Sequence, residues 1–348
     1  MRISFIPLFL ILALLTAGCT NLNIFGGDVV SIITNTNVEG FQDVLIIKDI
    51  RTIPRSIIPP DQDTFLSFVL ENKDDKKSAK NVKIQLFDAP GFKSSSTLCN
   101  VHECKPEECS TDAPCANILP GEEKLISFNL KSPTQQEIGN VKNEITFSFK
   151  TNYEFDANTL YRIPVVNMNE ILSRQRADQN VEIDSPKFIS SGPIQADIEL
   201  KGQDFVIAGN EATLQVQFSN KGDKRKGSVV GNIIEDEDIT ITFPEDLTVT
   251  DWPKKVSDAV NNNGVPSNPL VDDNSQSSTE KNAFSCSGNT CTNSGSVELF
   301  EGESIPLLFK IKSSAINDPF KTYDISIAFS YQYELRDSIK VTVQPNEE

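Results

Sequence analysis

The order of strand-like segments along this chain occurs twice, and this repetition constrains the fold most. Residues 65–72 alternate apolar and polar side chains and run into a charged turn, and residues 212–220 do the same. In the second segment, Leu214, Val216 and Phe218 fall on one face, as a half-buried strand requires. Each repeat therefore contains an alternating strand that ends in a charged turn.

The later segments of the two stretches correspond in the same order. The matching pairs are residues 119–131 with 300–310, 144–154 with 324–334, and 161–166 with 337–343. The first pair is a Gly-Glu turn followed by a strand, the second is a longer strand, and the third is a short strand expected to close its own unit. Corresponding segments in one order indicate a duplicated domain. Short alternating strands punctuated by Gly, Pro, Asn and Asp favour an all-β fold of two tandem immunoglobulin-like antiparallel β-sandwiches after a signal peptide.

The composition shifts along the chain predict where these units begin and end. A short polar helix is expected over residues 169–178, between the repeats, and the region 253–282 is dense in Asn, Ser, Asp and Pro. The predicted parts are a signal peptide of the lipoprotein type at 1–18, a tether at 19–40, a first domain at 41–167, a linker with the short helix at 168–192, and a second domain at 193–345 with a long inserted loop at 253–296.

The aromatic residues of the longer strands are predicted to pack in the cores. Phe147, Phe149, Phe329 and Tyr331 lie on the alternating faces on which two sheets would close. An aromatic platform for a ligand, formed by Tyr331 and Tyr333, is the alternative, but aromatic residues in strands normally pack.

The start of the chain predicts export. Met1 and Arg2 supply one positive charge, and residues 3–17 are rich in Ile, Leu, Phe and Ala. This run is shorter than the ~20 residues that cross the hydrocarbon core as a helix. A basic start, a short apolar run and small residues together are typical of a secretory signal peptide.

The end of this segment indicates how the exported protein is held. Residues 15–19, Leu-Thr-Ala-Gly-Cys, resemble a lipoprotein processing box, although Thr16 stands where Leu is usual. The alternative is an ordinary cleaved signal with a chance cysteine at its edge. Because a lone cysteine is a liability in an oxidising compartment, we expect Cys19 to carry a lipid. Such an anchor holds a protein on the membrane surface without spanning the bilayer.

The charge of the chain narrows the choice of partners. The formal net charge is −17. Nucleic acid is a poor partner for so acidic a chain, because its phosphates require clustered Lys and Arg. The expected partners are the membrane, through the N-terminal lipid, and an unknown surface protein or envelope polymer.

Apart from Cys19, the six remaining cysteines are predicted to form disulfides, as is usual in an exported chain. Cys286 and Cys291 should pair across a hairpin turn. Four further cysteines lie close together and allow three pairings. Duplication favours Cys104 with Cys109, because they share the spacing of Cys286 and Cys291, and leaves Cys99 with Cys115.

Two metal sites are the alternatives, and neither is expected. His102 stands among the four clustered cysteines, but their gaps of four, four and five residues do not match the two-residue gaps usual for structural zinc. The acidic run at 235–238 lacks the alternating ligands and central Gly of a calcium loop. Neither cofactors nor catalytic residues are predicted, since the chain has no Gly-x-Ser-x-Gly elbow and no phosphate-binding Gly-rich loop.

The strand–turn–strand of the first repeat resembles a known family. Residues 68–87 read Phe-Val-Leu-Glu-Asn-Lys-Asp-Asp-Lys-Lys-Ser-Ala-Lys-Asn-Val-Lys-Ile-Gln-Leu-Phe. An Asn before a charged turn, followed by Ala-x-Asn-Val, is similar to the cell-adhesion-related immunoglobulin-like domains of prokaryotic surface proteins. The tandem layout behind a lipoprotein box is similar to archaeal-type surface lipoproteins. The second repeat departs from this pattern, with Gly-Ser-Val-Val-Gly at 227–231.

These observations together predict a non-enzymatic, lipid-anchored cell-surface protein with an adhesion, binding or structural role. An accessory subunit of an envelope assembly, such as a secretion, pilus or transport complex, is the alternative. A surface hydrolase is the third reading, and no residue pattern supports it. The expected location is the outer face of the cell membrane or the cell surface.

Overall fold

The computed structural model describes most of the chain between residues 42 and 345. The described ranges are 42–54, 57–94, 100–101, 117–139, 141–181, 183–254 and 281–345. The predicted signal peptide, the tether and Cys19 therefore lie outside the described residues. Gly40–Glu348 form one compact unit.

More than half of the described residues lie in strands, most of which alternate buried and exposed side chains. The strands of the first half of the chain are β1 (Leu45–Ile53), β2 (Ile57–Ile58), β3 (Asp63–Asn72), β4 (Lys80–Asp88), β5 (Lys93–Ser94), β6 (Asn100–Val101), β7 (Glu123–Lys131) and β8 (Asn143–Val166). Those of the second half are β9 (Lys187–Ile189), β10 (Ile194–Leu200), β11 (Val206–Ile207), β12 (Glu211–Asn220), β13 (Gly227–Val229), β14 (Ile233–Ile234), β15 (Ile239–Thr242), β16 (Leu247–Asp251), β17 (Phe284–Ser287), β18 (Thr290–Asn293), β19 (Val297–Phe300), β20 (Glu303–Ser304), β21 (Leu307–Ser313) and β22 (Phe320–Val343). The helical segments are α2 (Gln135–Ile138), α3 (Met168–Arg176) and the single turn η1 (Val230–Asn232).

These strands form three sheets, whose pairings are antiparallel except for two short parallel pairs. A five-stranded sheet has the order β1-β3-β7-β5, and a seven-stranded sheet has the order β14-β19-β20-β12-β21-β16. The third sheet has ten strands, with β8 and β22 side by side at its centre. The predicted fold class is confirmed as all-β, with antiparallel sheets that form two sandwiches.

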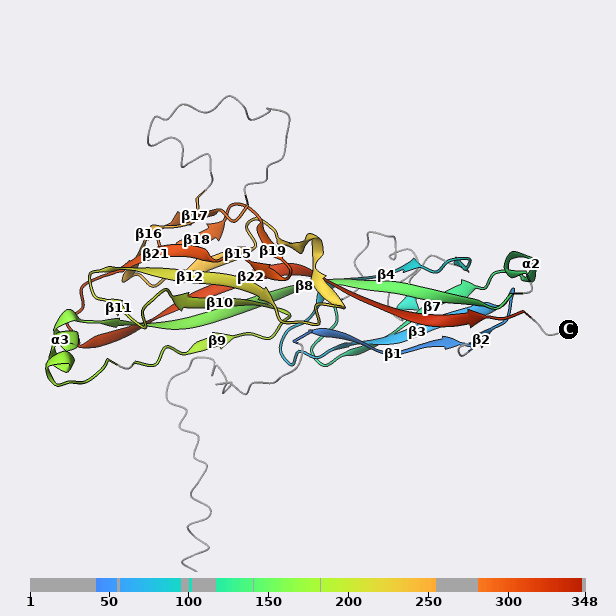
Figure 1. The fold of residues 1–348 in the computed structure, drawn as a ribbon, viewed down its shortest axis with the longest axis horizontal. Coiled ribbons are helices and arrows are strands. Elements are labelled where there is room, and N and C mark those ends of the chain that lie inside the picture. The colour runs from blue at the N-terminus through green and yellow to red at the C-terminus, as the bar shows by residue number, and fades with distance from the viewer. Residues whose placement is uncertain are drawn as a thin grey trace, which may run out of the picture. The chain divides into compact units, whose positions relative to one another are not determined.

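The two central strands extend through both sandwiches (Figure 1). β8 and β22 each have 24 residues and pair antiparallel over that whole length, without a register shift. The sequence predicted two separate strands in each of these regions, and this is wrong. Phe155, Ala157 and Thr159 continue the buried face without a break, at 0%, 4% and 1% exposure.

This pairing exchanges the last strand between the repeats. Residues 337–343, from the end of the second repeat, pair with 143–149 of the first. Residues 161–166, from the end of the first repeat, pair with 320–325 of the second. Each short closing strand therefore completes the other unit rather than its own.

Aromatic residues join the facing sheets in each sandwich. In the first sandwich, Phe68 of β3 stacks on Phe149 of β8 with 4.3 Å between ring centroids. In the second, Phe218 of β12 meets Phe329 of β22 edge-on at 5.1 Å. Among the described residues, the buried apolar side chains form one continuous cluster that spans both sandwiches. Phe147, Phe149, Phe329 and Tyr331 belong to it, as predicted.

The repeats are related by an approximate two-fold axis through the middle of the shared ladder. Tyr153, in Asn-Tyr-Glu, and Tyr333, in Gln-Tyr-Glu, hold the same place in the two aligned repeats. These two residues also pair directly with each other, and their rings lie 5.7 Å apart. When two equivalent residues pair with each other, the axis that relates the repeats passes between them.

The helix predicted for residues 169–178 is present as α3, within the usual uncertainty of helix ends. It follows β8 directly, and the chain then returns, because β9 pairs antiparallel with β8 at Thr159–Tyr161. The segment thus closes a turn at one end of the ten-stranded sheet. No helix within the described ranges is long and apolar enough to cross a membrane.

Candidate functional site

The most elaborate polar structure among the described residues lies where the two sandwiches meet. Two equivalent turns build it, one after β3 at 73–77 and one after β12 at 221–226. Each turn follows a buried Asn, which is Asn72 (0% exposed) in the first repeat and Asn220 (5% exposed) in the second. Each turn also reaches across to residues of the other sandwich.

The second turn is held by Asn220 and Tyr333. The Asn220 amide donates to the Gly227 carbonyl at 3.2 Å, and its Oδ1 accepts the Gly222 N–H at 2.9 Å. The Tyr333 hydroxyl donates to the same Oδ1 at 3.1 Å. Because Asn and Asp side chains readily bond backbone groups two residues on, this sequence favours the turn.

The same turn binds the start of the first sandwich. The Asp223 N–H donates to Asp43 Oδ2 at 3.1 Å, and the Gln42 N–H donates to the Lys221 carbonyl at 3.3 Å. Lys226 Nζ lies 2.7 Å from Asp337 Oδ2 on β22. These bonds hold Gln42 and Asp43, which precede β1, at the junction.

The first turn makes the equivalent contacts in the opposite direction. The Asn72 amide donates to the carbonyls of Lys77 and Ile118 at 2.9 and 3.0 Å, and its Oδ1 accepts the Asp74 N–H at 2.9 Å. Ser191, which precedes β10, donates its hydroxyl to Asp74. Lys77 Nζ donates to the backbone carbonyl of Asp156 at 2.9 Å, whereas Lys226 pairs with the side-chain carboxylate of Asp337.

The packing at Gly227 explains why the second repeat lacks the Ala-x-Asn-Val pattern. A Cβ at this position would lie 2.5 Å from the hydroxyl oxygen of Tyr333. The backbone of β13 can therefore approach the buried tyrosine only where the residue has no side chain.

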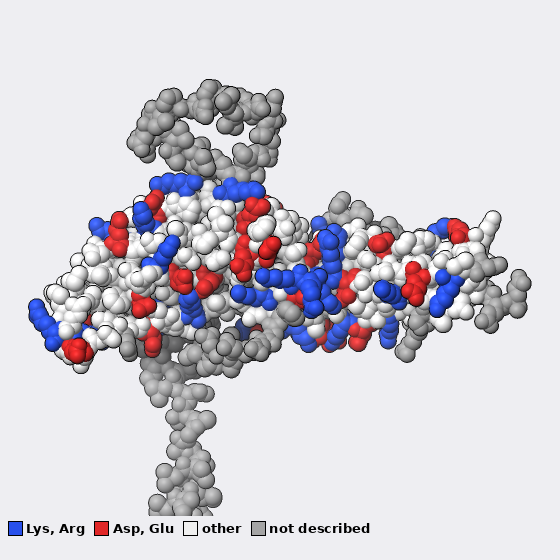
Figure 2. Space-filling model, viewed as in Figure 1, with Lys and Arg blue, Asp and Glu red and all other residues white. Residues whose placement is uncertain are grey.

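Burial dominates the electrostatics of this junction. It raises the pKa of Asp43, and it raises the pKa of Tyr333, which also faces the charge of Asp43. Arg225, by hydrogen bonding, lowers the pKa of Asp223. Burial lowers the pKa of Lys77. Over the visible face as a whole, acidic and basic side chains are interspersed, so the net charge does not produce a single acidic field there (Figure 2).

A cavity of about 240 Å³ adjoins the network. It is lined by the start of β1, the Asp223–Lys226 side of the second turn, and Leu335, Arg336 and Asp337 of β22. The carboxylates on its wall already accept donors or pair with Lys226. This arrangement makes a rigid polar joint, and it presents no nucleophile paired with a base.

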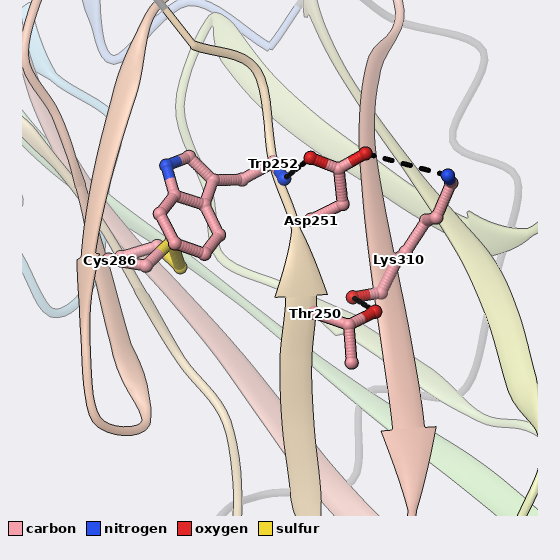
Figure 3. The surroundings of a disulfide bond; sticks show 6 residues. Thr250, Asp251, Trp252, Cys286 and Lys310 are labelled. Carbon is pink, nitrogen blue, oxygen red and sulfur yellow. Dashed lines mark hydrogen bonds and ion pairs between the residues drawn. A yellow bond between two sulfur atoms is a disulfide. The ribbon is translucent and has the colours of Figure 1, made fainter. Parts of the chain in front are cut away.

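The second notable feature is a disulfide beside the only tryptophan in the chain. Cys286 and Cys291 face each other across the β17–β18 hairpin and are bonded to each other, which is the pairing expected from the sequence. Figure 3 shows the Trp252 indole lying beside Cys286. The Asp251 carboxylate accepts from the backbone N–H of Trp252 at 3.1 Å and lies 3.5 Å from Lys310 Nζ.

Most of the other predicted site residues lie outside the described residues. These are Cys19, Cys99, His102, Cys104, Cys109 and Cys115, so their lipid attachment and pairings stay predictions. Of the polar region 253–282, residues 255–280 also lie outside them.

The remaining candidates are placed clearly. Tyr331 and Tyr333 are 2% and 0% exposed, so they pack in the core and form no surface platform. In the acidic run at 235–238, Asp238 accepts the Ser330 hydroxyl at 2.9 Å. No cluster of three or more His, Cys, Asp or Glu that could hold a metal occurs in the described part of the chain.

Sequence reasoning missed Asp43, whose role depends on contacts with residues far along the chain. The two Asn turns did leave a signal. Asn-Lys followed by Asp and Lys occurs in both repeats, at 72–76 and 220–224. This pattern predicts a charged turn, but it does not indicate that the turn contacts the other sandwich.

Comparison with known proteins gives no family. No family model and no curated protein matches the chain. One similar solved structure is the MSCRAMM ACE of Enterococcus faecalis, which binds its ligands by the collagen Hug model, at 9% identity and a TM-score of 0.20, covering 86% of this chain and 95% of that one. Another contains manganese lipoxygenase of Gaeumannomyces graminis and part of zonadhesin of Komagataella pastoris, at 14% identity and a TM-score of 0.18, covering 85% and 96%. A third is the collagen adhesin of S. aureus, at 10% identity and a TM-score of 0.15, covering 87% and 97%. At these TM-scores the matches carry no argument, so the function has to be inferred from the residues of this chain.

Proposed function

We propose that this chain is a non-enzymatic binding or structural module, exported and held at the outer face of the cell membrane by a lipid on Cys19. Its role is to present two joined sandwiches to another surface protein or to an envelope polymer. The observation that carries the proposal is the junction, where the two sandwiches share β8 and β22 and are bonded through both Asn turns.

Such a joint suits a protein that bears a load or presents a binding surface, because the joint resists bending between the two sandwiches. Separate domains on a linker move independently unless their interface is large. Here the shared ladder contributes 24 residue pairs, and the apolar core continues from one sandwich into the other. A hinge between the sandwiches would have to break this ladder.

The position of residue 42 supports attachment from the N-terminal side. Gln42 and Asp43 bond to the second turn, so the chain enters the described module at the junction. A lipid near the N-terminus would therefore pull on the most cross-linked part of the module. The far ends of both sandwiches, at α2 and α3, would not carry that load.

The lipid is tested by the Cys19→Ala variant expressed in the native host. We expect wild-type protein in the membrane fraction, with an acyl mass on its N-terminal peptide, and C19A in the medium. The Cys286→Ala/Cys291→Ala double variant is the matched control and should stay in the membrane fraction. Membrane retention of C19A equal to that of wild type would refute the anchor.

Binding is tested by deleting residues 255–280, which belong to the loop predicted from the sequence, since loops on rigid scaffolds usually carry recognition. Beads coated with purified module should retain envelope fragments from host cells that lack the gene, and the deletion should abolish retention while leaving the thermal transition unchanged. Unchanged retention would refute this region as the contact. Recovery of one stoichiometric protein partner after mild crosslinking would instead support an accessory subunit of an envelope assembly.

A further inference from the structure

The first sandwich is completed by the last strand of the chain. Residues 342 and 343 of β22 pair with β2, and 337–343 pair with the first part of β8. Val341 and Val343 are 2% and 0% exposed, so their side chains lie in the core of the first sandwich. Without this segment, the first sandwich would expose an unpaired edge of β8 and part of its core.

The second sandwich depends in the same way on the end of the first repeat. Ile163 and Val165 of β8 are both 0% exposed and lie on the strand that pairs with Phe320–Ile325 of β22. This part of β8 is available as soon as the first repeat has emerged. The second sandwich can therefore close before residues 337–343 are in place, whereas the first cannot.

Among the described residues of the first repeat, no other strand is left to take the place of residues 337–343. A hairpin within that repeat would have to reverse the chain between 155 and 160. Phe155 and Thr159 are instead buried on the face that continues into the second sandwich, at 0% and 1% exposure. The first repeat thus remains a strand acceptor until the C-terminal strand reaches it.

We propose that the two ends of the chain depend on each other in folding. The first repeat gains stable structure only when residues 337–343, from the C-terminal end, pair with the open edge of β8. The acceptor takes an extended strand with alternating apolar residues, which this chain supplies from its own end. In a chain exported from its N-terminus, as the proposed function requires, the first sandwich would close only after the C-terminus has crossed. Non-local pairing of this kind also makes folding slow, because a long loop must close first.

The test is pulse-labelling hydrogen exchange during refolding of the purified full-length protein from denaturant, which does not depend on lipid or export. We expect the amides of β3 and of residues 143–149 to become protected in the same phase as those of 337–343. Protection of β12 and β21 should appear in that phase or earlier. Protection of β3 and 143–149 before 337–343 would overturn the proposal.

Two full-length variants make the test specific. Val343→Asp places a charge at a 0% exposed position, and should leave β3 and 143–149 at least tenfold less protected while β12 and β21 keep wild-type protection. Lys340→Glu, on the exposed face of the same strand, should behave as wild type. Normal protection of the first sandwich in V343D would overturn the proposal. Membrane retention of C19A, which would refute the lipid anchor, would leave it standing.

Discussion

Replacing Ile163 by Ala should loosen the second sandwich, although Ile163 belongs to the first repeat. Its side chain is 0% exposed and lies in the core of the second sandwich, and its backbone pairs with Tyr323 of β22. If each repeat closed on itself, the same change would loosen the first sandwich instead. The location of the effect therefore distinguishes exchanged strands from closed ones.

The size of the effect follows from the lost packing. Truncating a fully buried Ile to Ala typically costs about 2–5 kcal/mol, because the transfer energy of the side chain is lost and a cavity remains. Since about 1.4 kcal/mol corresponds to a factor of ten, amides that exchange through opening of the second sandwich should exchange roughly 30-fold to several thousand-fold faster.

Native-state hydrogen exchange with mass spectrometry on the full-length protein measures this directly. Faster exchange is expected in β12, β21 and residues 320–333, with less change in β3 and β7. Arg162→Ala is the control, because Arg162 lies beside Ile163 and forms a half-exposed bond to Asp324, a type of pair that contributes less than about 1 kcal/mol. Faster exchange confined to β3, β7 and 143–149 in I163A would refute the exchanged arrangement.

Three further perturbations test the junction and the disulfide. Asn72→Ala leaves the carbonyls of Lys77 and Ile118 without the side-chain amide that donates to them, and should lower the free energy of unfolding by about 1–3 kcal/mol. Urea titrations should show this loss with an unchanged dependence of the free energy on urea concentration, and an unchanged free energy of unfolding would show that these bonds are not needed. Cys286→Ala/Cys291→Ala should cost about 2 kcal/mol in the chain-entropy model and shift the emission of Trp252, whereas an unaltered urea midpoint would contradict the stabilising role. Burial raises the pKa of Asp43 above 3.8, so the stability that its protonated form contributes is present below pH 3.8 and is lost as the pH rises through the raised pKa. Asp43→Asn should remove this decline in the urea midpoint at pH values above 3.8, and a pH profile identical to that of wild type would refute the reasoning.

Alternation in the sequence was enough to predict the all-β fold and most of the core. Leu214, Val216 and Phe218 of β12 are each 0% exposed, as their spacing indicated. The helix at α3 and the pairing expected of Cys286 and Cys291 also depend on local signals, namely a short polar segment and a hairpin turn.

The exchange of strands could not be predicted, because alternation shows which residues are buried but not against which partner. Residues 155–160 contain Asp156 and Asn158, which resemble a turn between two short strands. Both lie on the outer face of a continuous strand and are exposed, while their neighbours Phe155 and Ala157 stay in the core. Only the register of β8 against β22 reveals that the repeat does not close on itself.

The contacts at the junction could not be predicted from the sequence, for a related reason. Asp43 and Tyr333 are separated by 290 positions in the chain and meet only through the exchanged ladder, with 3.5 Å between the Tyr333 hydroxyl and Asp43 Oδ1. Sequence alone identified the two charged turns as repeated features. It did not indicate that each turn would bind the opposite sandwich.

An engineered disulfide between β8 and β22 tests most directly whether the final strand of the chain completes the first sandwich. Thr146 and Lys340 face each other across β8 and β22, on the side of the ladder that the first core does not cover. Directly opposed residues in antiparallel strands are close enough for a disulfide. Thr146→Cys/Lys340→Cys, purified from the exported fraction, should yield a linked peptide pair by mass spectrometry. Free thiols at both positions in otherwise native protein would contradict the exchange of the final strand.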